Sequence, residues 1–354
     1  MKKRRGPQVP VSRVTGRRGA NGRTTDMTAY AGIDAGGTLI KIAYSQNGSG
    51  SGERLSSSEE QEGQKDKEVR PYSEGSLPET DRAWQKRHPE EAYAPLPELL
   101  KFPTSRLEDA ADWIKRHLPP DTRLGFTGGQ AERLRALLPD RTDFVSVPEF
   151  EATAEGAVRI LRSGSDRRGE ANVSAERFVL VNVGTGTSLH LIDGAERPRL
   201  GGIGLGGGTI VGLTELLCGV RDYAEIARLA PLGDREAVDL TVGQIYAPAT
   251  PPIAGDLTAA NFARPLPPEG GARPQDYAAA VVGMVAEIVT TVGVQYAKLH
   301  GARRVVYVGS TYENNELLRE LTTRFTEMLG SEAVIPGSGL YSGAIGALHA
   351  AAER

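Results

Sequence analysis

Two glycine-rich turns carry the residue types that can hold a nucleotide phosphate. The first, Asp34-Ala35-Gly36-Gly37-Thr38, interrupts an apolar run and is followed by Lys41, and the second is Gly184-Thr185-Gly186-Thr187. Turns without large side chains let backbone N–H groups approach phosphate oxygens closely. A lysine adds a point charge, and an aspartate at the end of a buried strand can hold Mg²⁺ through water. The two turns therefore favour phosphoryl chemistry.

Either turn alone has an ordinary structural explanation, because Gly-Gly is a common hairpin turn between antiparallel strands. The occurrence of two such turns weakens that explanation. A third glycine-rich segment, Gly201 to Thr209, follows Arg199 and precedes an apolar stretch with helical spacing. We interpret it as a turn that leads into a helix. A glycine run at a helix start predicts a backbone anion site.

Glu149 is the candidate for proton transfer. It stands between a strand expected at 144–147 and an amphipathic helix that begins after Pro148. A carboxylate at a helix start also has two structural explanations, interaction with the helix dipole and capping of the first turn. The residue alone does not decide between these and catalysis. Glu151 and Glu155 are expected to be solvent-facing charges of the same helix.

The elements that position these residues follow a mixed α/β pattern. At 354 residues the chain exceeds what one hydrophobic core usually supports, so we expect two lobes with a cleft between them. The segment 275–300 is apolar nearly all round, which is typical of a core helix or of one shared between subunits. We expect strands at 30–45 (two, around the first turn), 99–103, 123–127, 144–147, 178–183, 188–193 and 304–308, and helices at 106–118, 131–138, 223–228, 275–300 and 315–329.

Three segments have too little apolar content to fold by burial. Residues 1–26 form a basic tail that we expect to be disordered, roughly 46–97 a disordered insertion, and 163–176 a flexible loop. The expected N-terminal lobe is therefore 27–162, and the C-terminal lobe 177–354.

Composition excludes several classes of protein. A net charge of −3 gives no electrostatic reason to bind nucleic acid or anionic lipid. The single cysteine, Cys218, excludes an internal disulfide and a zinc site built from several thiolates, and the five histidines are dispersed. We find no apolar run of roughly 18 residues and no secretory signal, so we expect no membrane span. The expected location is the cytoplasm.

Seven motifs together resemble those of the type II pantothenate kinases. They are DAGGTLIK at 34–41, VPEFEAT at 147–153, VNVGTGTS at 181–188, RLGGIGLGGGT at 199–209, GDLTAANF at 255–262, VVYVGSTYENNELLR at 305–319 and SGAIGALH at 342–349. The resemblance covers Tyr30 to the C-terminus, apart from the insertion and the loop. That family belongs to the sugar kinase, actin and heat-shock chaperone superfamily. The resemblance implies an α/β fold of two ribonuclease-H-like lobes with a nucleotide cleft between them.

The resemblance also implies roles for individual residues. Asp34 would support Mg²⁺ bound with ATP, Glu149 would be the general base, and Arg199 would bind the substrate. Thr258 and Phe325 would line a pantothenate channel from the partner subunit of a homodimer, although the family often has tyrosine where this chain has Phe325. The ATP phosphates and adenosine would be held by Gly36, Gly37, Thr38, Lys41, Gly184, Thr185, Gly186, Thr187, Gly206, Gly207, Gly208, Thr209, Gly309 and Ser310.

The implied activity is ATP-dependent phosphorylation of the primary hydroxyl of pantothenate to 4'-phosphopantothenate, the first step of coenzyme A biosynthesis. One alternative is another kinase of the superfamily, acting on a sugar or an N-acetylhexosamine. Zinc-containing sugar kinases are disfavoured, because Cys218 alone cannot form their cysteine cluster. Another alternative is a sensor that closes on a nucleotide without chemistry. The presence of both Glu149 and Arg199 argues against it.

Overall fold

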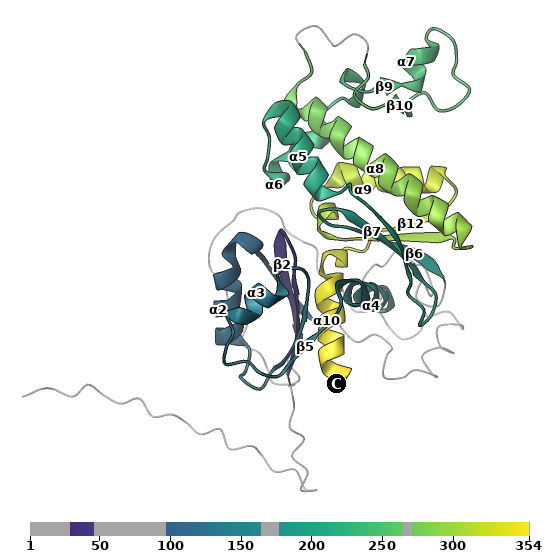
Figure 1. Cartoon of the computed structure of the whole chain (residues 1–354). Helices are drawn as coiled ribbons and strands as arrows, with labels where there is room; N and C mark the ends of the chain where they lie inside the picture. The colour runs from purple at the N-terminus through teal and green to yellow at the C-terminus, as the bar shows by residue number, and fades with distance from the viewer. Residues whose placement is uncertain (1–28, 46–96, 164–176, 265–270, 354) are drawn as a thin grey trace, which may run out of the picture.

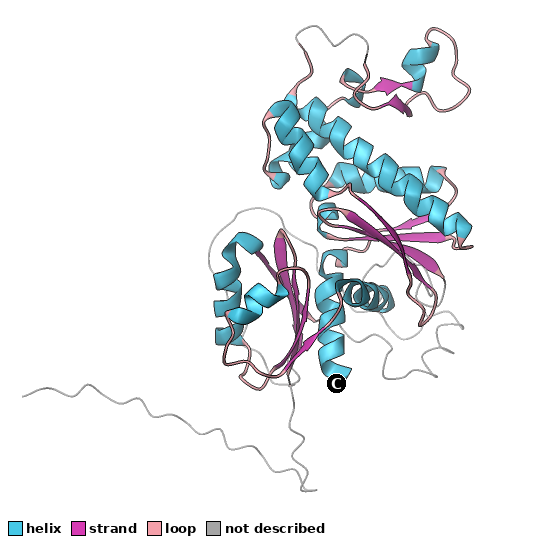
Figure 2. Cartoon of the chain, viewed as in Figure 1, coloured by secondary structure: helices cyan, strands magenta, loops and turns pink. Residues whose placement is uncertain are grey.

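The computed structural model describes residues 29–45, 97–163, 177–264 and 271–353. These residues form two five-stranded sheets with helices packed on both faces of each (Figure 2). The expected basic tail at 1–26 lies outside the described residues, as do nearly all of the expected insertion at 46–97 and of the loop at 163–176.

The first sheet has the strand order β3-β2-β1-β4-β5. β1 pairs antiparallel with β2, β2 antiparallel with β3, and β4 is parallel to both of its neighbours. Helices α2 and α3 cover one face, where residues such as Leu107, Ile114 and Leu134 pack with Ile33 and Ile40 of the sheet. The bounds are β1 (Tyr30–Ala35), β2 (Leu39–Ser45), β3 (Glu98–Pro103), α2 (Leu107–His117), β4 (Arg123–Thr127), α3 (Ala131–Ala136) and β5 (Phe144–Ser146).

The second sheet repeats this arrangement with the order β12-β11-β6-β7-β8. Strands β6, β7 and β8 pair antiparallel, and the parallel strands β11 and β12 extend the sheet beyond β6. Two sheets that each join three antiparallel strands to two parallel ones are the expected ribonuclease-H-like lobes, so the expected fold class is confirmed. The bounds are β6 (Phe178–Val183), β7 (Thr187–Ile192), β8 (Arg199–Ile203), β11 (Arg304–Val308) and β12 (Glu332–Val334).

Four helices cover the outer face of the second sheet. The longest, α8, is central to the largest core, where Val281, Val285 and Val289 are almost fully buried. A small unit of β9, α7 and β10 lies beyond α5 and α8 (Figure 1). The bounds are α5 (Gly207–Cys218), α6 (Tyr223–Leu229), β9 (Leu240–Thr241), α7 (Val242–Tyr246), β10 (Thr258–Ala260), α8 (Pro274–Leu299) and α9 (Glu316–Met328).

Helix α8 corrects one sequence expectation. It is long and apolar enough to cross a membrane by length and composition, whereas we expected no such segment. Within the protein, 67% of its apolar 18-residue window is buried. A helix that is apolar all round is required where a core surrounds it, and this is one of the two interpretations that the 275–300 pattern left open.

Two helices, α4 (Glu149–Arg162) and α10 (Ser342–Glu353), lie between the two sheets (Figure 1). Helix α4 packs Ala157 and Val158 against Phe178 and Leu180 of the second sheet. Helix α10 packs on the first sheet so closely that a Cβ at Gly32 of β1 would stand 2.0 Å from the Ala344 carbonyl oxygen. Helix α4 of the expected 27–162 lobe thus packs on the second sheet, and α10 of the expected 177–354 lobe packs on the first. The lobe boundaries themselves stay a prediction.

The two central helices also touch each other backbone to backbone. A Cβ at Gly156 of α4 would stand 1.8 Å from the carbonyl oxygen of Ser342, and one at Gly346 of α10 would stand 1.9 Å from that of Ala152. Distances below about 3 Å leave no room for a methyl group. Glycine at both positions is therefore a packing requirement.

The expected turn at 201–209 is partly wrong, because residues 199–203 form the edge strand β8. Ser188 pairs with Gly202, and Leu189 pairs with Gly201. Glycine is disfavoured in strands, so its presence here argued against one. The structure gives the reason for it: a Cβ at Gly201 would stand 3.1 Å from the Tyr296 hydroxyl, and one at Gly202 would stand 2.6 Å from Nη2 of Arg199.

We predict that Gly156→Ala destabilises the protein by more than about 2 kcal/mol, because the added methyl group collides with the α10 backbone. Gly212→Ala is the matched control in helix α5, since a Cβ there meets no atom within 4 Å. That change should stabilise by up to about 1 kcal/mol through helix propensity alone. Thermal unfolding of both variants measures the difference. Equal effects of the two substitutions would contradict the tight contact of α4 with α10.

Candidate active site

A pocket between the two lobes collects most of the sequence-predicted phosphate residues. Its walls come from the ends of β1, β6 and β11 and from the first turns of α4 and α10. Thr153, Asn182, Ser342 and Gly343 also line it; they belong to the quoted motifs, but no role was expected for them. Leu39 and Leu340 complete the lining. The predicted residues that line it are Asp34, Gly36, Gly37, Thr38, Lys41, Glu149, Gly184, Thr185, Gly309 and Ser310.

Asp34 and Lys41 form an ion pair on one wall of this pocket. They stand opposite each other in the β1–β2 hairpin, and Lys41 Nζ lies 3.0 Å from Asp34 Oδ2. Their side chains are only 13% and 11% exposed, respectively. The carboxylate also faces the start of α10, because a Cβ at Gly343 would stand 2.8 Å from Oδ2. A helix N-terminus is a favourable neighbour for a negative charge, so Lys41 and the start of α10 both face the Asp34 carboxylate with complementary charge.

The two glycine turns face each other across the cleft. A Cβ at Gly37 would lie 3.7 Å from the hydroxyl oxygen of Thr185, in the opposite lobe. The first turn is held by two hydrogen bonds, Gly36 N–H to Leu39 O at 3.0 Å and Thr104 Oγ1 to Gly36 O at 2.9 Å. Because Gly37, Thr38 and Thr185 are exposed to this space, a phosphate chain can lie between the turns.

The second turn is fastened to the start of α5. The N–H groups of Gly207 and Gly208 donate to the carbonyl oxygens of Gly184 at 2.8 Å and of Thr185 at 3.0 Å. Gly206 also lies against the 184–187 turn, since a Cβ at Gly206 would stand 2.7 Å from Gly184 O. The backbone donors of Gly207 and Gly208 are thus already used within the protein. The anion site expected at this helix start is not available through them, and the glycine run serves to hold the 184–187 turn.

The remaining predicted members of this region have similar structural roles. The Thr209 hydroxyl accepts from Gly206 N at 3.3 Å and donates to Gly204 O at 3.1 Å. The Thr187 hydroxyl donates to Leu205 O at 2.7 Å. Gly309 has a φ of 112°, and a Cβ there would stand 2.3 Å from Val183 O. Gly309 therefore permits the chain after β11 to pass directly beside the end of β6, where it lines the pocket.

Glu149 is the first residue of α4 and faces the pocket. Partial burial is the largest cause that raises the pKa of its carboxyl group, and the neighbouring charge of Asp34 raises it further. Lys41 acts in the opposite direction. A carboxylate with a raised pKa accepts a proton more readily than an ordinary surface glutamate. The interaction with Asp34 and Lys41 also shows that these three charged groups share one site.

The two glutamates expected to face solvent behave differently. Glu151 is exposed, as expected. Glu155 is the half-buried centre of an ion-pair cluster, in contrast to the expectation, because it contacts both Arg159 of α4 and Arg197 of the β7–β8 hairpin at 2.6 Å. Burial alone would raise the pKa of Glu155, but Arg197 and Arg159 hold it below its usual value. Helical periodicity could not reveal this, since Arg197 comes from a distant hairpin.

Arg199 lies beside the pocket without lining it. It is exposed at the start of β8, and its guanidinium carbon lies 5.1 Å from the centroid of the Phe150 ring. Because Phe150 directly follows Glu149, this contact brings Arg199 near the proposed base. His190 stands opposite Arg199 in the β7–β8 pairing, and its ring lies 5.1 Å from the Phe150 ring. Sequence reasoning selected neither Phe150 nor His190.

Thr258 and Phe325 are not brought to the pocket in this chain. The Thr258 hydroxyl donates to Glu287 Oε1 at 2.7 Å and accepts from Arg235 Nη2 at 2.8 Å, in the small unit beyond α8. Phe325 belongs to the core of the second lobe and is 4% exposed. A ring buried to this extent has little surface for a ligand. Their expected place in a channel shared between subunits stays a prediction.

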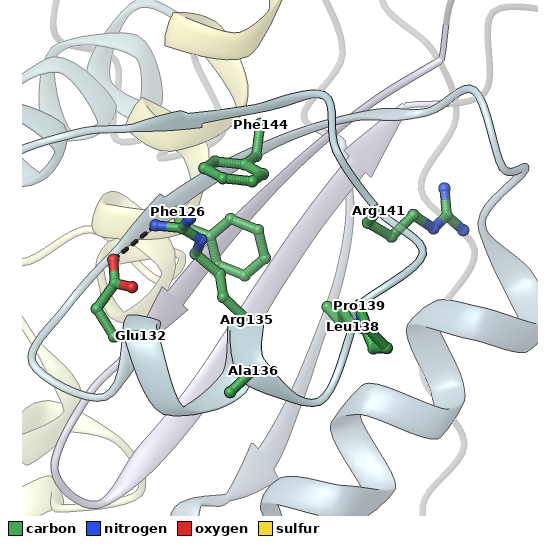
Figure 3. A pocket seen from close by; sticks show the side chains of 8 residues that line it. All are labelled: Phe126, Glu132, Arg135, Ala136, Leu138, Pro139, Arg141 and Phe144. Carbon is green, nitrogen blue, oxygen red and sulfur yellow. Dashed lines mark hydrogen bonds and ion pairs between the residues drawn. The ribbon is translucent and has the colours of Figure 1, made fainter.

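A second hollow lies between α3 and β5, away from these residues (Figure 3). Its arginines have structural partners. The Arg135 guanidinium carbon lies 3.6 Å from the Phe144 ring centroid, and its Nη1 lies 2.6 Å from Glu132. Arg141 points away from the hollow in Figure 3 and donates to the carbonyl groups of Leu118 and Pro119 after α2. This hollow contains none of the predicted phosphate residues.

Comparisons with known proteins show which family the chain resembles. The Fumble family model matches residues 30–350. The chain is 37% identical over 247 residues to a type II pantothenate kinase of Staphylococcus epidermidis, covering 70% of this chain and 89% of that protein. It is 32% identical over 320 residues to one of Staphylococcus saprophyticus, covering 90% and 98%. Among solved structures, the activator of the 2-hydroxyisocaproyl-CoA dehydratase from Clostridium difficile with bound ADPNP has a TM-score of 0.49 and 13% identity, covering 92% of this chain and 95% of that chain.

Glu149→Gln should raise the thermal unfolding midpoint at about pH 7. Because the pKa of Glu149 is raised in the folded chain, its ionised form costs stability above that pKa. The amide avoids this cost. Its advantage should shrink as the pH falls and should vanish below the ordinary glutamate pKa of about 4.3, because there the carboxyl group is protonated in both the folded and the unfolded chain.

The control is Glu151→Gln, which makes the same charge change in the same helical turn at an exposed position. It should give no such gain at either pH. Melting curves recorded at about pH 7 and about pH 4.5 compare the two variants. Equal changes of the unfolding midpoint in both variants would mean that the helix dipole, and not the environment of Glu149, causes the change in stability.

Proposed function

This chain belongs to the Fumble family and, within it, to the type II pantothenate kinases, and from that premise we propose how it works. It is an ATP-dependent kinase that phosphorylates pantothenate in coenzyme A biosynthesis. We propose that the primary hydroxyl of pantothenate receives the phosphoryl group and that 4'-phosphopantothenate is the product. The observation that carries this proposal is the meeting of Glu149 with the Asp34–Lys41 pair at a pocket between two facing glycine turns.

The phosphate chain of ATP lies between the two turns in this proposal. Gly36, Gly37 and Thr38 approach it from one lobe, and Gly184 and Thr185 from the other. The N–H groups of Gly36 and Gly184 already donate to Leu39 O and Gly186 O, so Gly37, Thr38 and Thr185 are the proposed backbone donors to phosphate. Lys41 contributes positive charge. The contact of Gly37 with Thr185 supports this arrangement, because both turns face the same space.

Mg²⁺ accompanies ATP in this proposal, and Asp34 is the residue that would hold it. Among the described residues, no group of three or more histidine, cysteine, aspartate or glutamate side chains could form a metal site. Mg²⁺ commonly binds through one or two carboxylates, water and substrate phosphates, so a single buried carboxylate fits it. When bound, the ion would neutralise charge on the phosphate oxygens.

Glu149 acts as the general base. The pantothenate hydroxyl oxygen attacks the γ-phosphorus while the bond to the ADP oxygen breaks, and the hydroxyl proton passes to the Glu149 carboxylate. The position of Glu149 at the start of α4 fixes its distance from the phosphate turns, since α4 is packed between both sheets. Positioning and charge stabilisation supply most of the catalysis in phosphoryl transfer.

Arg199 receives the carboxylate of pantothenate. A guanidinium group pairs well with a carboxylate through two parallel hydrogen bonds. The contact of Arg199 with Phe150 supports this role, because it sets the cation beside the residue that follows the base. The substrate then extends from Glu149 at its hydroxyl end to Arg199 at its acid end.

We also propose that the chain is a homodimer in the cytoplasm. Several large apolar side chains of α5, α7 and the adjoining loop are exposed, including Leu216, Ile245 and Ile253. Large apolar side chains exposed to this extent support a surface that a second copy covers. Sedimentation decides the point, since a monomer with full activity at micromolar concentration would contradict a shared pantothenate channel.

The proposed substrate is tested by transfer of labelled phosphate from ATP to pantothenate, N-acetylglucosamine and glucose. Pantothenate alone should be phosphorylated, because only it offers the carboxylate that Arg199 binds. Transfer to a sugar and not to pantothenate would replace this proposal with a sugar kinase. Nucleotide binding without transfer to any acceptor would favour the sensor.

The proposed base is tested by Glu149→Gln, which should lower kcat by roughly 10² to 10⁴, the range for loss of a general base. Binding of ATP should persist, because the amide is nearly the same shape. Glu151→Gln is the control and should leave kcat near the wild-type value. A similar kcat for the two variants would require a different proton acceptor.

A further inference from the structure

His190 is a buried histidine that the mechanism above does not use. It lies in the middle of β7 and is 1% exposed. In the strand pairing it stands between Leu180 of β6 and Arg199 of β8. Leu180 packs with α4, so His190 is on the sheet face that α4 covers. Helix α4, which begins with Glu149, packs on this face, and the strands of the sheet lead into the phosphate turn at 184–187.

Three groups surround the imidazole ring. Its Nε2 atom lies 3.2 Å from the Ser188 hydroxyl, two residues earlier on the same face of β7. Its ring lies 5.1 Å from the ring of Phe150, which also carries the Arg199 guanidinium on its surface. His190 thus contacts the serine directly and reaches Arg199 both across the strand and through Phe150.

Ser188 connects this cluster to the nucleotide pocket. It pairs with Asn182 of β6 on one side and with Gly202 of β8 on the other. Asn182 lines the pocket, and the Arg199 guanidinium lies over Gly202, where a Cβ would stand 2.6 Å from Nη2. A polar strip therefore runs across three strands, from Asn182 through Ser188 to the Arg199 guanidinium.

We propose that His190 is a positioning residue for the acid end of the substrate, holding the Ser188 hydroxyl and, through Phe150, the Arg199 guanidinium in one arrangement. This inference rests on the proposed function, since it requires that Arg199 receives a carboxylate. The Ser188 hydroxyl, with its orientation set by His190, offers a hydrogen bond to the chain of the substrate between its two ends.

The charge state of His190 suits this role. Burial lowers the pKa of His190 to about 4, and the nearby charge of Arg199 acts in the same direction. The ring is therefore neutral near neutral pH and has one nitrogen donor and one nitrogen acceptor. A neutral ring can fix the Ser188 hydroxyl without a second positive charge that would compete with Arg199 for the carboxylate.

The test compares His190→Gln with His190→Asn. Glutamine can put an amide nitrogen near the position of Nε2 and keep the contact with Ser188, whereas asparagine reaches only the position of Nδ1. Asparagine should raise KM for pantothenate about tenfold, which is the loss of one hydrogen bond of about 1.4 kcal/mol. Glutamine should stay within about threefold of wild type. KM for ATP and kcat should change little in either variant, because the contacts of His190 are with Ser188 and Phe150 and not with Glu149 or the phosphate turns.

The same comparison in a Ser188→Ala background isolates the contact. Without the hydroxyl, the difference between the asparagine and glutamine variants should disappear, because the two changes share one interaction. Equal KM values for the two variants in the native background would overturn the proposal. So would an equal rise in KM for ATP, or a difference that persists without Ser188, because each would indicate a general effect on packing.

The wild-type assay separates this inference from the proposed function. If wild type phosphorylates another hydroxy acid and not pantothenate, the proposed substrate is wrong. The KM values of the His190→Asn and His190→Gln variants, measured with that acid, then still decide the role of His190. If wild type phosphorylates only uncharged acceptors, Arg199 has no carboxylate to bind, and both the proposed function and the role of His190 are rejected.

Discussion

The contact between α4 and α10 is the constraint on which the rest of this structure depends. The two helices meet at Gly156 and Gly346 with no side chain between their backbones, and each packs on a different sheet. Their first turns open into the nucleotide pocket, where α4 presents Glu149 and α10 presents Ser342 and Gly343. The separation of the lobes, and hence the position of the base, is therefore set by backbone contact. Rigid elements of this kind hold a catalytic group more accurately than loops do.

Local patterns in the sequence predicted most of the fold. Strands β1, β6 and β11 were expected at nearly the observed bounds, because each is a short apolar run that ends at glycine, and β2 was expected because the apolar run resumes after the first turn. The same runs led directly to Asp34, Lys41 and the 184–187 turn, since residues at the ends of neighbouring strands gather at one edge of a sheet. The wrong expectation for β8 has a tertiary origin, because Tyr296 and Arg199 occupy the space beside its glycines. Strand propensity contains no information about such neighbours.

Sequence patterns predicted those site residues that stand together in short local motifs. Asn182, Phe150 and His190 join it through strand register and through the position of α4, which no local pattern encodes. Glu155 is a second case in which local spacing did not predict the environment of a side chain. Its spacing suggested a surface charge, yet two arginines, one of them from a separate hairpin, leave it half-buried. A glycine in a motif does not show by itself whether it serves ligand binding or packing. Gly37 faces the cleft, whereas Gly206 packs against another turn.

The packing of α10 on the first sheet also affects how the chain is made. The strands of that sheet leave the ribosome early, but one of its faces is covered by residues 342–353, near the end of the 354-residue chain. Ala43 and the glycines of β1 and β4 stay uncovered until α10 emerges. Domains generally fold in the order of synthesis, but this lobe cannot finish before α10, which follows every strand of the second sheet in the sequence, is made. During that interval the nascent chain exposes an apolar sheet face, which is the kind of surface that chaperones bind.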